Sequence, residues 1–435
     1  MSSNPCISVE GSRFLTYDLA QRIRAEHQTP VYVYDAKTIK SQAEKALNFP
    51  APYGLTVRFA MKACPNASIL NLMHGLGLHF DVSSGFEATR AMLAGIPANH
   101  LSLSSQELPS NLSNLIKSGV LFNACSLHQL DAFGSIFPGA ECGIRFNPGK
   151  GSGGTGKTNV GGPASSFGIW HELKEEVKAI ISKHSLKVIR IHTHIGSGSD
   201  PTVWEAVSAM SLSLVEEFPD VTIINLGGGF KVGRMSYELA NSTDLQKVGI
   251  PIRAALENFE QRTGRRLKLE IEPGTFLMAN SGALLTSVQD MVNTGSAGHT
   301  FLKLDAGMTE VLRPSLYGAQ HPIVGFASDK HSTENIETME YIIVGHCCES
   351  GDLFSCAPGD GDTLKARFLP RMRIGDLVSI EGAGAYCSSM STKNYNSFPE
   401  APEVLLDEDN NVHLIRRRQT MDQILSNEIL WKGSS

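Results

Sequence analysis

The sequence lacks a run of about 18 consecutive apolar residues, so no membrane-spanning helix is expected. Its first residues, Met1 to Tyr17, have no cationic start, apolar run or small-residue cleavage site of a secretory signal. It also lacks a basic excess, because the formal net charge is −6. A nucleic-acid partner is therefore not indicated. These absences predict a cytoplasmic protein whose partner is a small molecule, with no membrane and no nucleic acid.

Cysteine pairs at metal-binding spacing are missing as well. The eight cysteines are scattered along the chain without a C-x-x-C pair. In a chain of this size they indicate reduced thiols of the cytosol, and neither a disulfide framework nor a zinc site is expected. Hydrophobic residues make up 41% and charged residues 19% of the 435 residues, which is typical of a globular protein. The length predicts two domains.

Apolar, β-branched runs alternate with amphipathic helical patterns between residues 57 and 274. Eight such runs are found, at Val57–Ala63, Leu78–Ser84, His100–Ser105, Leu121–Ser126, Cys142–Asn147, Lys187–Ile195, Thr222–Leu226 and Leu267–Ile271. Helical spacing is clear in Ala67–Leu76, Phe86–Ala94 and Trp170–His184. This number of units predicts an α/β fold with a TIM-like (β/α)8 barrel. A doubly wound open sheet is the alternative, but it rarely has eight parallel strands.

After Gly274 the pattern changes to short strands separated by turn residues. The expected strands are Gly282–Val288, Phe301–Asp305, Met339–Val344, Leu377–Glu381 and Glu403–Leu406, with a helical tail at Met421–Leu430. We therefore expect residues 36–280 to form the barrel and residues 281–435 to form a mostly β domain. The early strand Val31–Tyr34 is able to pair with either domain, and we expect residues 1–35 to pack with the β domain.

Unusual polar residues follow several barrel strands, at the end where barrels carry their function. Lys62 follows an apolar run, where desolvation would favour the neutral amine that a Schiff base needs. A lysine at a barrel rim that reaches toward water is the structural alternative. The triplet Gly227–Gly229 presents backbone amides that can cradle a phosphate, or it forms only a tight turn. Glu272 is suited to face a pyridine nitrogen, or it is an ordinary loop glutamate.

His192 and His194 lie two residues apart on one strand, a spacing that metals also use. No acidic or cysteine ligand stands near them in the sequence, so no metal site is predicted. His194 is better interpreted as a flat ring stacked on a planar cofactor, with Ser197 as a donor to phosphate.

Residues Gly151 to Thr158 satisfy the phosphate-loop pattern G-x-x-x-x-G-K-[ST] of nucleotide hydrolases. That motif needs a helix to begin at its lysine. The residues that follow, Asn159-Val160-Gly161-Gly162-Pro163, cannot start a stable helix. The pattern is therefore interpreted as a chance match, and a nucleotide hydrolase is not favoured.

A series of sequence blocks, in a fixed order, resembles one family from about residue 31 to the end. The blocks are AMKACPN (60–66), FDVSSGFE (80–87), RFNPG (145–149), KTNVGGPASSFGIW (157–170), HIGSG (194–198), LGGGF (226–230), EIEPG (270–274), LDAGM (304–308), RPSLYGAQHPI (313–323), CESGD (348–352), GAYCSSMSTKNYNS (384–397) and LIRRRQT (414–420). The chain resembles the bacterial diaminopimelate decarboxylases. These belong to the fold-type III, alanine-racemase-like enzymes that depend on pyridoxal 5′-phosphate (PLP), a group that includes ornithine decarboxylase.

This resemblance implies a role for each matching residue. Lys62 would hold PLP covalently. The protein would be a homodimer with shared active sites, in which the partner subunit supplies Cys348. Either Cys348 or Lys62 would protonate the decarboxylated carbon. The residues implied in cofactor binding are Lys62, His194, Ser197, Gly228, Gly229, Glu272, Gly274 and Tyr386. Those implied in substrate binding are Arg313 and Tyr317 for a distal carboxylate, Glu349 for a distal ammonium, and Tyr386.

The resemblance predicts conversion of meso-2,6-diaminopimelate to L-lysine and carbon dioxide. One position departs from the family pattern, because Thr275 stands where the family usually has arginine after Glu-Pro-Gly. That arginine commonly contacts the distal carboxylate or the phosphate, so its loss bears on substrate choice. A decarboxylase for ornithine or lysine on the same scaffold is the alternative function. A PLP-binding regulatory protein is a further alternative, although such proteins usually lack the β domain.

Overall fold

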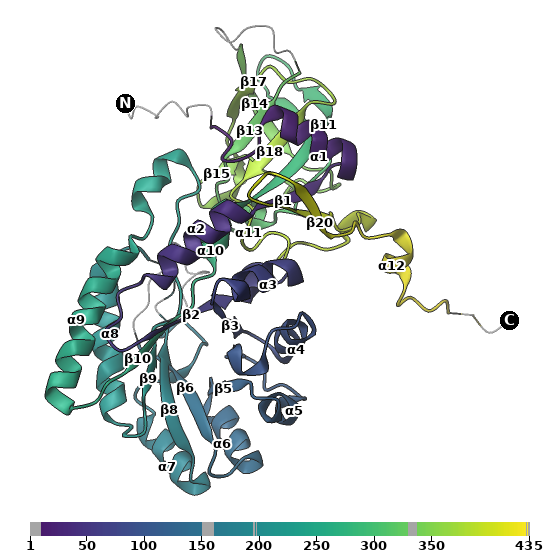
Figure 1. Ribbon diagram of the computed structural model, residues 1–435. Helices are drawn as coiled ribbons and strands as arrows, with labels where there is room; N and C mark the ends of the chain where they lie inside the picture. Colours follow the sequence, from purple (N-terminus) through teal and green to yellow (C-terminus); the bar gives the residue numbers. More distant parts are fainter. Residues whose placement is uncertain are drawn as a thin grey trace. The chain divides into compact units, whose positions relative to one another are not determined.

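The computed structural model describes residues 10–149, 161–194, 196, 198–328, 337–431 and 433 (Figure 1). These residues form two compact units. One unit holds Thr38–Gly233 and Glu238–Met278. The other holds the N-terminal residues up to Lys37, the short segment Arg234–Tyr237, and the described residues from Ala279 onward. The chain first passes from one unit to the other within α2 (Ala36–Leu47), and it passes between them again on either side of Arg234–Tyr237 and after Met278.

The first unit is a closed barrel of eight parallel strands. They are β2 (Leu55–Ala60), β3 (His79–Val82), β4 (Leu101–Leu103), β5 (Leu121–Ala124), β6 (Glu141–Asn147), β8 (Lys187–Thr193), β9 (Ile223–Asn225) and β10 (Lys268–Ile271). The ring closes because β10 pairs with β2 and β5 pairs with β6. The short strand β7 (Ile169–Trp170) pairs only with β6. Each of the eight runs predicted from the sequence overlaps one of these strands, although β2 and β6 begin before their predicted runs, and the predicted barrel is confirmed.

Helices surround these strands, as Figure 1 shows for the barrel. They are α3 (Ala67–Gly75), α4 (Gly85–Leu93), α5 (Leu112–Lys117), α6 (Leu127–Ile136), α7 (Lys174–His184), α8 (Pro201–Glu216) and α9 (Leu245–Thr263). Several begin within a few residues of a strand end, because a polar side chain caps the first free amides. Ser84 caps α4 by accepting from the Glu87 amide, and Ser126 caps α6 by accepting from the Gln129 amide. These short connections fix where the strand ends point.

The barrel interior contains a buried ion network as well as apolar side chains. Glu270 on β10 accepts a hydrogen bond from Arg58 on β2, with Nη2 and Oε1 2.8 Å apart. The other oxygen of Glu270 lies 3.0 Å from Nε of Arg190 on β8. All three side chains are almost fully buried, so each charge depends on the others for compensation. The two arginines hold the pKa of Glu270 below its usual value although burial acts to raise it.

The second unit is built on a nine-stranded sheet. Its path runs β17 (Arg367–Pro370), β14 (Thr338–Val344), β12 (Thr300–Leu304), β11 (Gly282–Asn293), β1 (Val31–Asp35), β19 (Glu403–Leu406) and β20 (Val412–Arg416), and off this path β18 (Leu377–Glu381) pairs with β11 and with β13 (Ile323–Phe326). The early strand β1 pairs antiparallel with β11 and parallel with β19. A separate hairpin joins β15 (Cys356–Ala357) to β16 (Asp360–Leu364).

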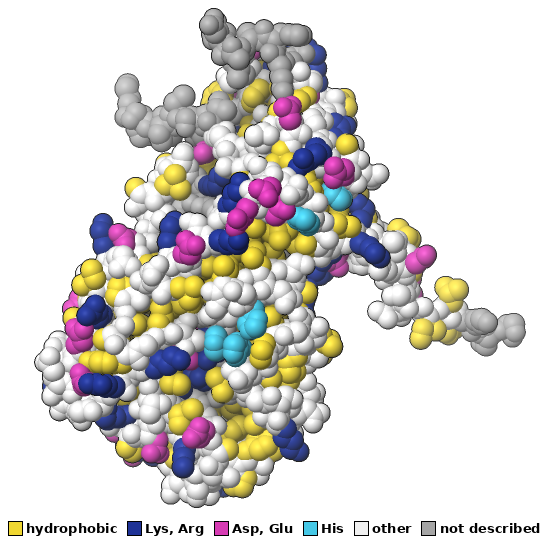
Figure 2. Space-filling view, in the orientation of Figure 1, with side chains coloured by type: hydrophobic (Ala, Val, Ile, Leu, Met, Phe, Trp, Pro, Cys, Tyr) yellow, Lys and Arg dark blue, Asp and Glu magenta, His cyan; other side chains and the backbone are white. Residues whose placement is uncertain are grey.

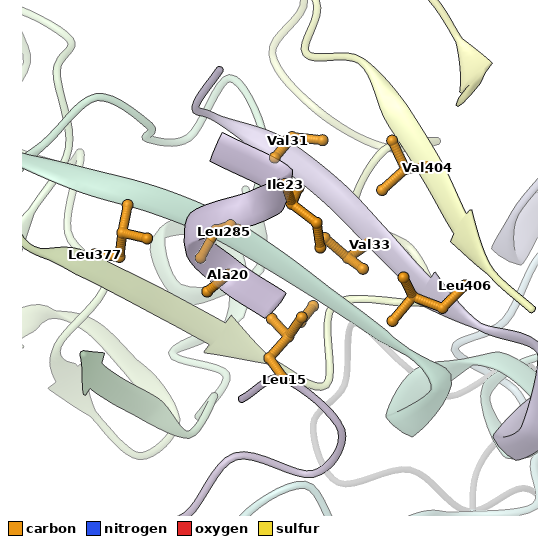
Figure 3. Close-up of a cluster of buried hydrophobic side chains, with 10 residues drawn as sticks. Leu15, Ala20, Ile23, Val31, Val33, Leu285, Leu377, Val404 and Leu406 are labelled. Atoms are coloured by element: carbon orange, nitrogen blue, oxygen red, sulfur yellow. The ribbon is translucent and has the colours of Figure 1, made fainter. Parts of the chain in front are cut away.

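One apolar core of this unit lies where α1 (Tyr17–His27) packs on the sheet (Figure 3). Ala20 and Ile23 of α1 face side chains of β1, β11, β18 and β19. The buried members of the cluster are Leu15, Ala20, Ile23, Val31, Val33, Ala283, Leu285, Leu377, Val404 and Leu406. These side chains come from the N-terminal segment and from strands of the sheet. Their shared burial stabilises the packing of the N-terminal segment on the β sheet.

The five strands expected after Gly274 are all present, while β13, β15, β16, β17 and β20 were not predicted. The predicted helical tail is wrong in its extent, because α12 (Met421–Leu425) ends five residues before Leu430. Among the described residues no helix combines the length and apolarity needed to cross a bilayer. Lysine, arginine and acidic side chains are interspersed over the face shown in Figure 2. The seven cysteines that the structure describes are all free.

The buried ion network predicts a large difference between two glutamate substitutions. Glu270→Gln should destabilise the barrel by about 3–5 kcal/mol, because it leaves Arg58 and Arg190 buried without a counter-ion. This corresponds to a fall in thermal midpoint on the order of 10 °C. Glu257→Gln, which removes an exposed ion pair with Arg253, is the control and should change the midpoint little. Equal midpoints for the two variants in thermal unfolding would contradict the assigned role of the network.

Candidate active site

Polar residues gather at the carboxyl ends of the barrel strands. Lys62 lies in a 3₁₀ turn, Met61–Ala63, directly after β2. Glu272 follows β10, His194 follows β8, and Gly227–Gly229 come two residues after β9. Because all eight strands are parallel, these ends share one face of the barrel. The structure therefore brings together four features that are up to 210 positions apart in the sequence.

The exposure of Lys62 differs from the expectation that its amine is desolvated. Its side chain is exposed, while its neighbours Met61 and Ala63 are fully buried. The buried apolar residues that suggested burial are those of β2 and the two neighbours of Lys62 in the turn, whereas the lysine side chain itself points away from them. An exposed lysine on a fixed turn is open to a cofactor arriving from solvent. The preceding strand residue Ala60 is paired with Asp81 on β3, so an acidic side chain lies on the strand next to the turn.

Glu272 is held in place by two side chains from neighbouring strands. Asn225 donates from Nδ2 to Oε1 of Glu272 over 2.6 Å. The other oxygen lies 3.3 Å from Nε2 of His192. Burial raises the pKa of Glu272, but His192, His194 and Arg145 more than offset it and hold the pKa well below its usual value. The carboxylate is therefore anionic although it is only 5% exposed.

Asp81 is a second carboxyl group at this face, and the sequence analysis did not identify it. It is 4% exposed, and its Oδ1 has no hydrogen-bond partner among the described residues. Burial and then the charge of Glu272 raise the pKa of Asp81 to about 8, while Lys62 opposes the rise. At neutral pH the pair therefore carries its negative charge on Glu272 and a proton on Asp81. An aspartate at the end of the run FDV was the signal available in the sequence.

The glycine triplet is packed too closely for side chains. A Cβ at Gly227 would lie 2.7 Å from the His194 ring, and one at Gly228 would lie 2.2 Å from the Glu272 carbonyl oxygen. Gly227 and Gly229 also have positive φ angles of 69° and 94°, which favour glycine. Oδ1 of Asn225 accepts from the Gly227 amide over 2.8 Å, so one side chain links the triplet to Glu272.

His194 is a neutral ring at the same face. Its Nδ1 accepts from the Gly196 amide over 2.9 Å, which places the ring hydrogen on Nε2. Burial, together with Arg145 and Lys62, holds the pKa of His194 well below its usual value. A flat, uncharged ring is suited to stacking on an aromatic cofactor. Ser197 and the segment from Gly151 to Thr158 lie outside the described residues, whereas Gly274 directly precedes α10 (Thr275–Met278).

The alternative that His192 and His194 bind a metal gains one possible ligand from the folded structure. His192 has no acidic neighbour in the sequence, but the fold places the Glu272 carboxylate beside it. Across the residues that the structure describes, no group of three or more metal-binding side chains is found. The pair His192–Glu272 is instead a buried ion-pair contact inside the barrel.

The second unit holds the remaining predicted residues on two linked segments. Arg313 and Tyr317 lie on α11 (Arg313–Tyr317), with the guanidinium 5.8 Å from the Tyr317 ring centre. Ser315 of the same helix donates to the Gly351 carbonyl over 2.6 Å. That bond joins α11 to the loop that carries Cys348 and Glu349.

This loop is fixed by one buried carboxylate. Asp352 accepts from the Cys347 amide over 2.8 Å and from the Met308 amide over 2.6 Å. A Cβ at Gly307 or Gly345 would lie within 2.3 Å of the same carboxylate, so glycine is required at both positions. Cys348 itself is exposed.

Tyr386 lies in the segment after β18, and its φ is +58°. A positive φ is rare for an aromatic residue and costs backbone energy, so it is found mainly where function fixes the conformation. The neighbouring residue Cys387 is fully buried. Tyr386, which has this unfavourable backbone conformation, is thus a residue that the family resemblance implies in cofactor and substrate binding.

The barrel face fits PLP in its chemistry. Backbone amides without side chains suit a phosphate, the neutral His194 suits an aromatic ring, and the anionic Glu272 suits a protonated pyridine nitrogen. An accessible lysine suits covalent attachment of an aldehyde. A (β/α)8 barrel with these four features defines the class of PLP-binding barrel enzymes.

The comparison with known proteins specifies the family. The chain belongs to the pyridoxal-dependent decarboxylases, because the model of their pyridoxal-binding domain matches residues 36–279. Its cofactor is therefore pyridoxal phosphate. Diaminopimelate decarboxylase from Escherichia coli K12 is 38% identical over 422 residues, covering 96% of this chain and 97% of the relative.

Solved structures agree with this assignment. A crystal structure of diaminopimelate decarboxylase, 37% identical, superposes with a TM-score of 0.88 over 96% of this chain and 99% of that one. The diaminopimelate decarboxylase of Helicobacter pylori, crystallised with L-lysine, is 29% identical. It superposes with a TM-score of 0.81, covering 93% of this chain and 98% of that one.

The position of Asn225 predicts a role in holding the cofactor. Asn225→Ala should weaken PLP binding by about 10-fold or more, because Glu272 loses a hydrogen bond made to its charged form. Titration of the apoprotein with PLP, followed by visible absorbance, measures this. Asn71→Ala, on the surface of α3, is the control. Identical PLP affinities for the two variants would show that Asn225 does not support the cofactor site.

Proposed function

We propose that this protein decarboxylates meso-2,6-diaminopimelate to L-lysine and carbon dioxide. The observation that carries the proposal is the Ser315–Gly351 hydrogen bond, which joins α11, with Arg313 and Tyr317, to the loop that carries Glu349. A guanidinium and a carboxylate held in this way suit the carboxylate and ammonium of a second amino-acid head. The named relatives support it, and L-lysine in the Helicobacter pylori structure is the product we propose here.

Each residue of the barrel face has a proposed task. Lys62 would hold the cofactor covalently through its side-chain amine. PLP bound there supplies the electron sink that takes up the electron pair left on Cα when carbon dioxide departs. Glu272 holds a proton at the pyridine nitrogen, because its own pKa is kept low. His194 covers one face of the ring, and Ser197, Gly228, Gly229 and Tyr386 bind the phosphate.

The final step returns a proton to Cα. Cys348 is the proposed donor, with Lys62 as the second candidate. The exposed position of the Cys348 side chain is compatible with a role toward a neighbouring chain. We propose that the protein is a cytoplasmic homodimer in which Cys348 of one subunit completes the site of the other. Asp352 fixes the backbone of that loop through the Cys347 amide.

A decarboxylase for ornithine or lysine is not favoured. Those substrates have a simple amine where diaminopimelate has an amino-acid head, so Arg313 would be left without a partner. A site built to pair a charged group discriminates strongly against a substrate that lacks it.

Substrate preference tests the proposed reaction. Carbon dioxide release should be about 10⁴-fold faster, as kcat/KM, from meso-diaminopimelate than from lysine or ornithine. Arg313→Ala should remove most of this preference, because the distal carboxylate then has no cationic partner. Comparable kcat/KM values for the three amino acids in the wild-type enzyme would leave a PLP decarboxylase but exclude the proposed substrate.

Subunit mixing tests the shared site. Lys62→Ala and Cys348→Ala proteins should each be nearly inactive, whereas their mixture should recover roughly a quarter of wild-type activity. Half of randomly mixed dimers are hybrids, and each hybrid has one intact site. The measurement is decarboxylase activity after subunit exchange, verified by mass spectrometry of the intact dimers. A mixture that stays inactive after full exchange would exclude a site shared in this way.

A further inference from the structure

The turn that carries Cys348 is also held from outside, by a second segment of the same unit. The Cys348 amide donates to Oδ1 of Asn396 over 2.8 Å. Two residues away on each side, the ring of His346 stacks on the ring of Phe398, with centroids 3.6 Å apart and an interplanar angle of 6°. These two contacts have the register of an antiparallel pair. Residues 394–398 therefore run alongside the turn.

The backbone of this second segment is unusual. Asn394, Asn396 and Ser397 have positive φ angles of 61°, 51° and 62°. Residues other than glycine rarely adopt this conformation, although asparagine tolerates it better than most. Such residues persist where the surrounding structure fixes them, and they cluster at functional sites. The side chain that contacts the Cys348 amide thus extends from a conformation that the fold imposes.

Hydrogen bonds join the second segment to the framework of the turn. Nδ2 of Asn394 donates to the Phe398 carbonyl over 2.9 Å and closes the segment on itself. The Thr392 amide donates to the Met308 carbonyl over 3.3 Å. Met308 in turn donates its own amide to the carboxylate of Asp352, which holds the turn from within. The second segment and the turn therefore belong to one hydrogen-bonded framework.

Hydrogen bonds inside the turn hold the neighbours of Cys348. Asp352 accepts from the Cys347 amide, and the Cys347 carbonyl accepts from the Glu349 amide over 2.8 Å. The Cys348 amide is the donor that reaches the second segment. Because the Cys348 side chain is exposed, its direction depends on the backbone more than on packing. Asn396 is therefore placed to control where the thiol points.

We propose that Asn396 is a positioning residue for the reaction, which orients Cys348 by holding its amide. This inference rests on the proposed function, in which Cys348 returns a proton to Cα. A proton donor must lie within hydrogen-bond reach of the atom that it protonates. A displacement of about 1 Å can cost about 100-fold in rate. Asn396 acts through the backbone of Cys348, so it needs no contact of its own with the substrate or PLP.

Two substitutions separate the hydrogen bond from the backbone conformation. Asn396→Gly removes the acceptor but adopts a positive φ without strain, whereas Asn396→Asp keeps an oxygen acceptor and tolerates the same conformation. In the PLP-loaded enzyme, Asn396→Gly should lower kcat for meso-diaminopimelate by about 5- to 10-fold. KM, the inhibition constant of L-lysine and the affinity for PLP should stay unchanged. Asn396→Asp should retain most of the kcat.

A matched control is available in the same unit. Asn410 is also an exposed asparagine with a positive φ, of 61°, and it lies in the turn between β19 and β20. Asn410→Gly should leave kcat and KM unchanged.

Alkylation of Cys348 tests the contact without relying on turnover. Its rate with iodoacetamide is followed against pH by peptide mass spectrometry, with fragmentation to distinguish exposed Cys348 from buried Cys347. The carboxylate introduced by Asn396→Asp disfavours the thiolate, which is the form that reacts. It should therefore move the alkylation profile of Cys348 to higher pH, by roughly half a unit. Asn396→Gly and Asn410→Gly should leave the profile where it is.

Separate outcomes test the reaction and the residue. Wild-type enzyme that releases no carbon dioxide from meso-diaminopimelate would refute the proposed function. Turnover by the wild type, with an unchanged kcat in Asn396→Gly, would refute the role of Asn396 alone. Equal losses of kcat and of L-lysine affinity would show that Asn396 only stabilises the turn, which also overturns the proposal. If Asn396→Gly does not fold, Asn396→Asp decides, because an alkylation profile identical to that of the wild type would contradict the contact.

Discussion

The ionised state of Glu272 is the constraint on which the barrel site depends. A carboxylate with so little exposure would ordinarily take up a proton, and a protonated group could not hold a proton on a pyridine nitrogen. Asn225 and His192 contact one oxygen each, and His192, His194 and Arg145 hold the pKa of Glu272 well below its usual value. Burial and the charge of Glu272 raise the pKa of Asp81 to about 8, so Asp81 keeps its proton at neutral pH. Two acids of the same barrel thus have separate roles because their surroundings differ.

The strand architecture makes this arrangement possible. Glu270 on β10 and Glu272, just after that strand, are two residues apart in extended chain, so both side chains point to the barrel interior. The first is neutralised by Arg58 and Arg190 in a layer that supports the fold. The second lies one layer closer to the carboxyl ends, beside His192 and Asn225. Stability and cofactor chemistry are therefore carried by adjacent layers of one barrel.

The barrel could be predicted from the sequence because buried parallel strands form continuous apolar runs with clear helices between them. The unpredicted strands are different: β16 is mostly exposed and β20 is an edge strand, so neither forms such a run. Lys62 was placed correctly after its strand, but its exposure depends on a turn that periodicity does not describe.

The supporting residues of the site were harder to predict. Asn225 sits inside the apolar run IINL, and only the pairing of β9 with β10 brings it to Glu272. Asp81 likewise reaches the site only through the pairing of β3 with β2. Motif resemblance assigns roles only to residues that match a family pattern, so it gives no information about Asn225, which stands outside the matched blocks.

Chemical trapping of the cofactor tests the central claim most directly. The protein is loaded with PLP, reduced with borohydride, digested and examined by peptide mass spectrometry. The account predicts that a single peptide, the one containing Lys62, gains the mass of the reduced cofactor. Labelling of a different lysine, or no labelled peptide from protein that binds PLP, would contradict it.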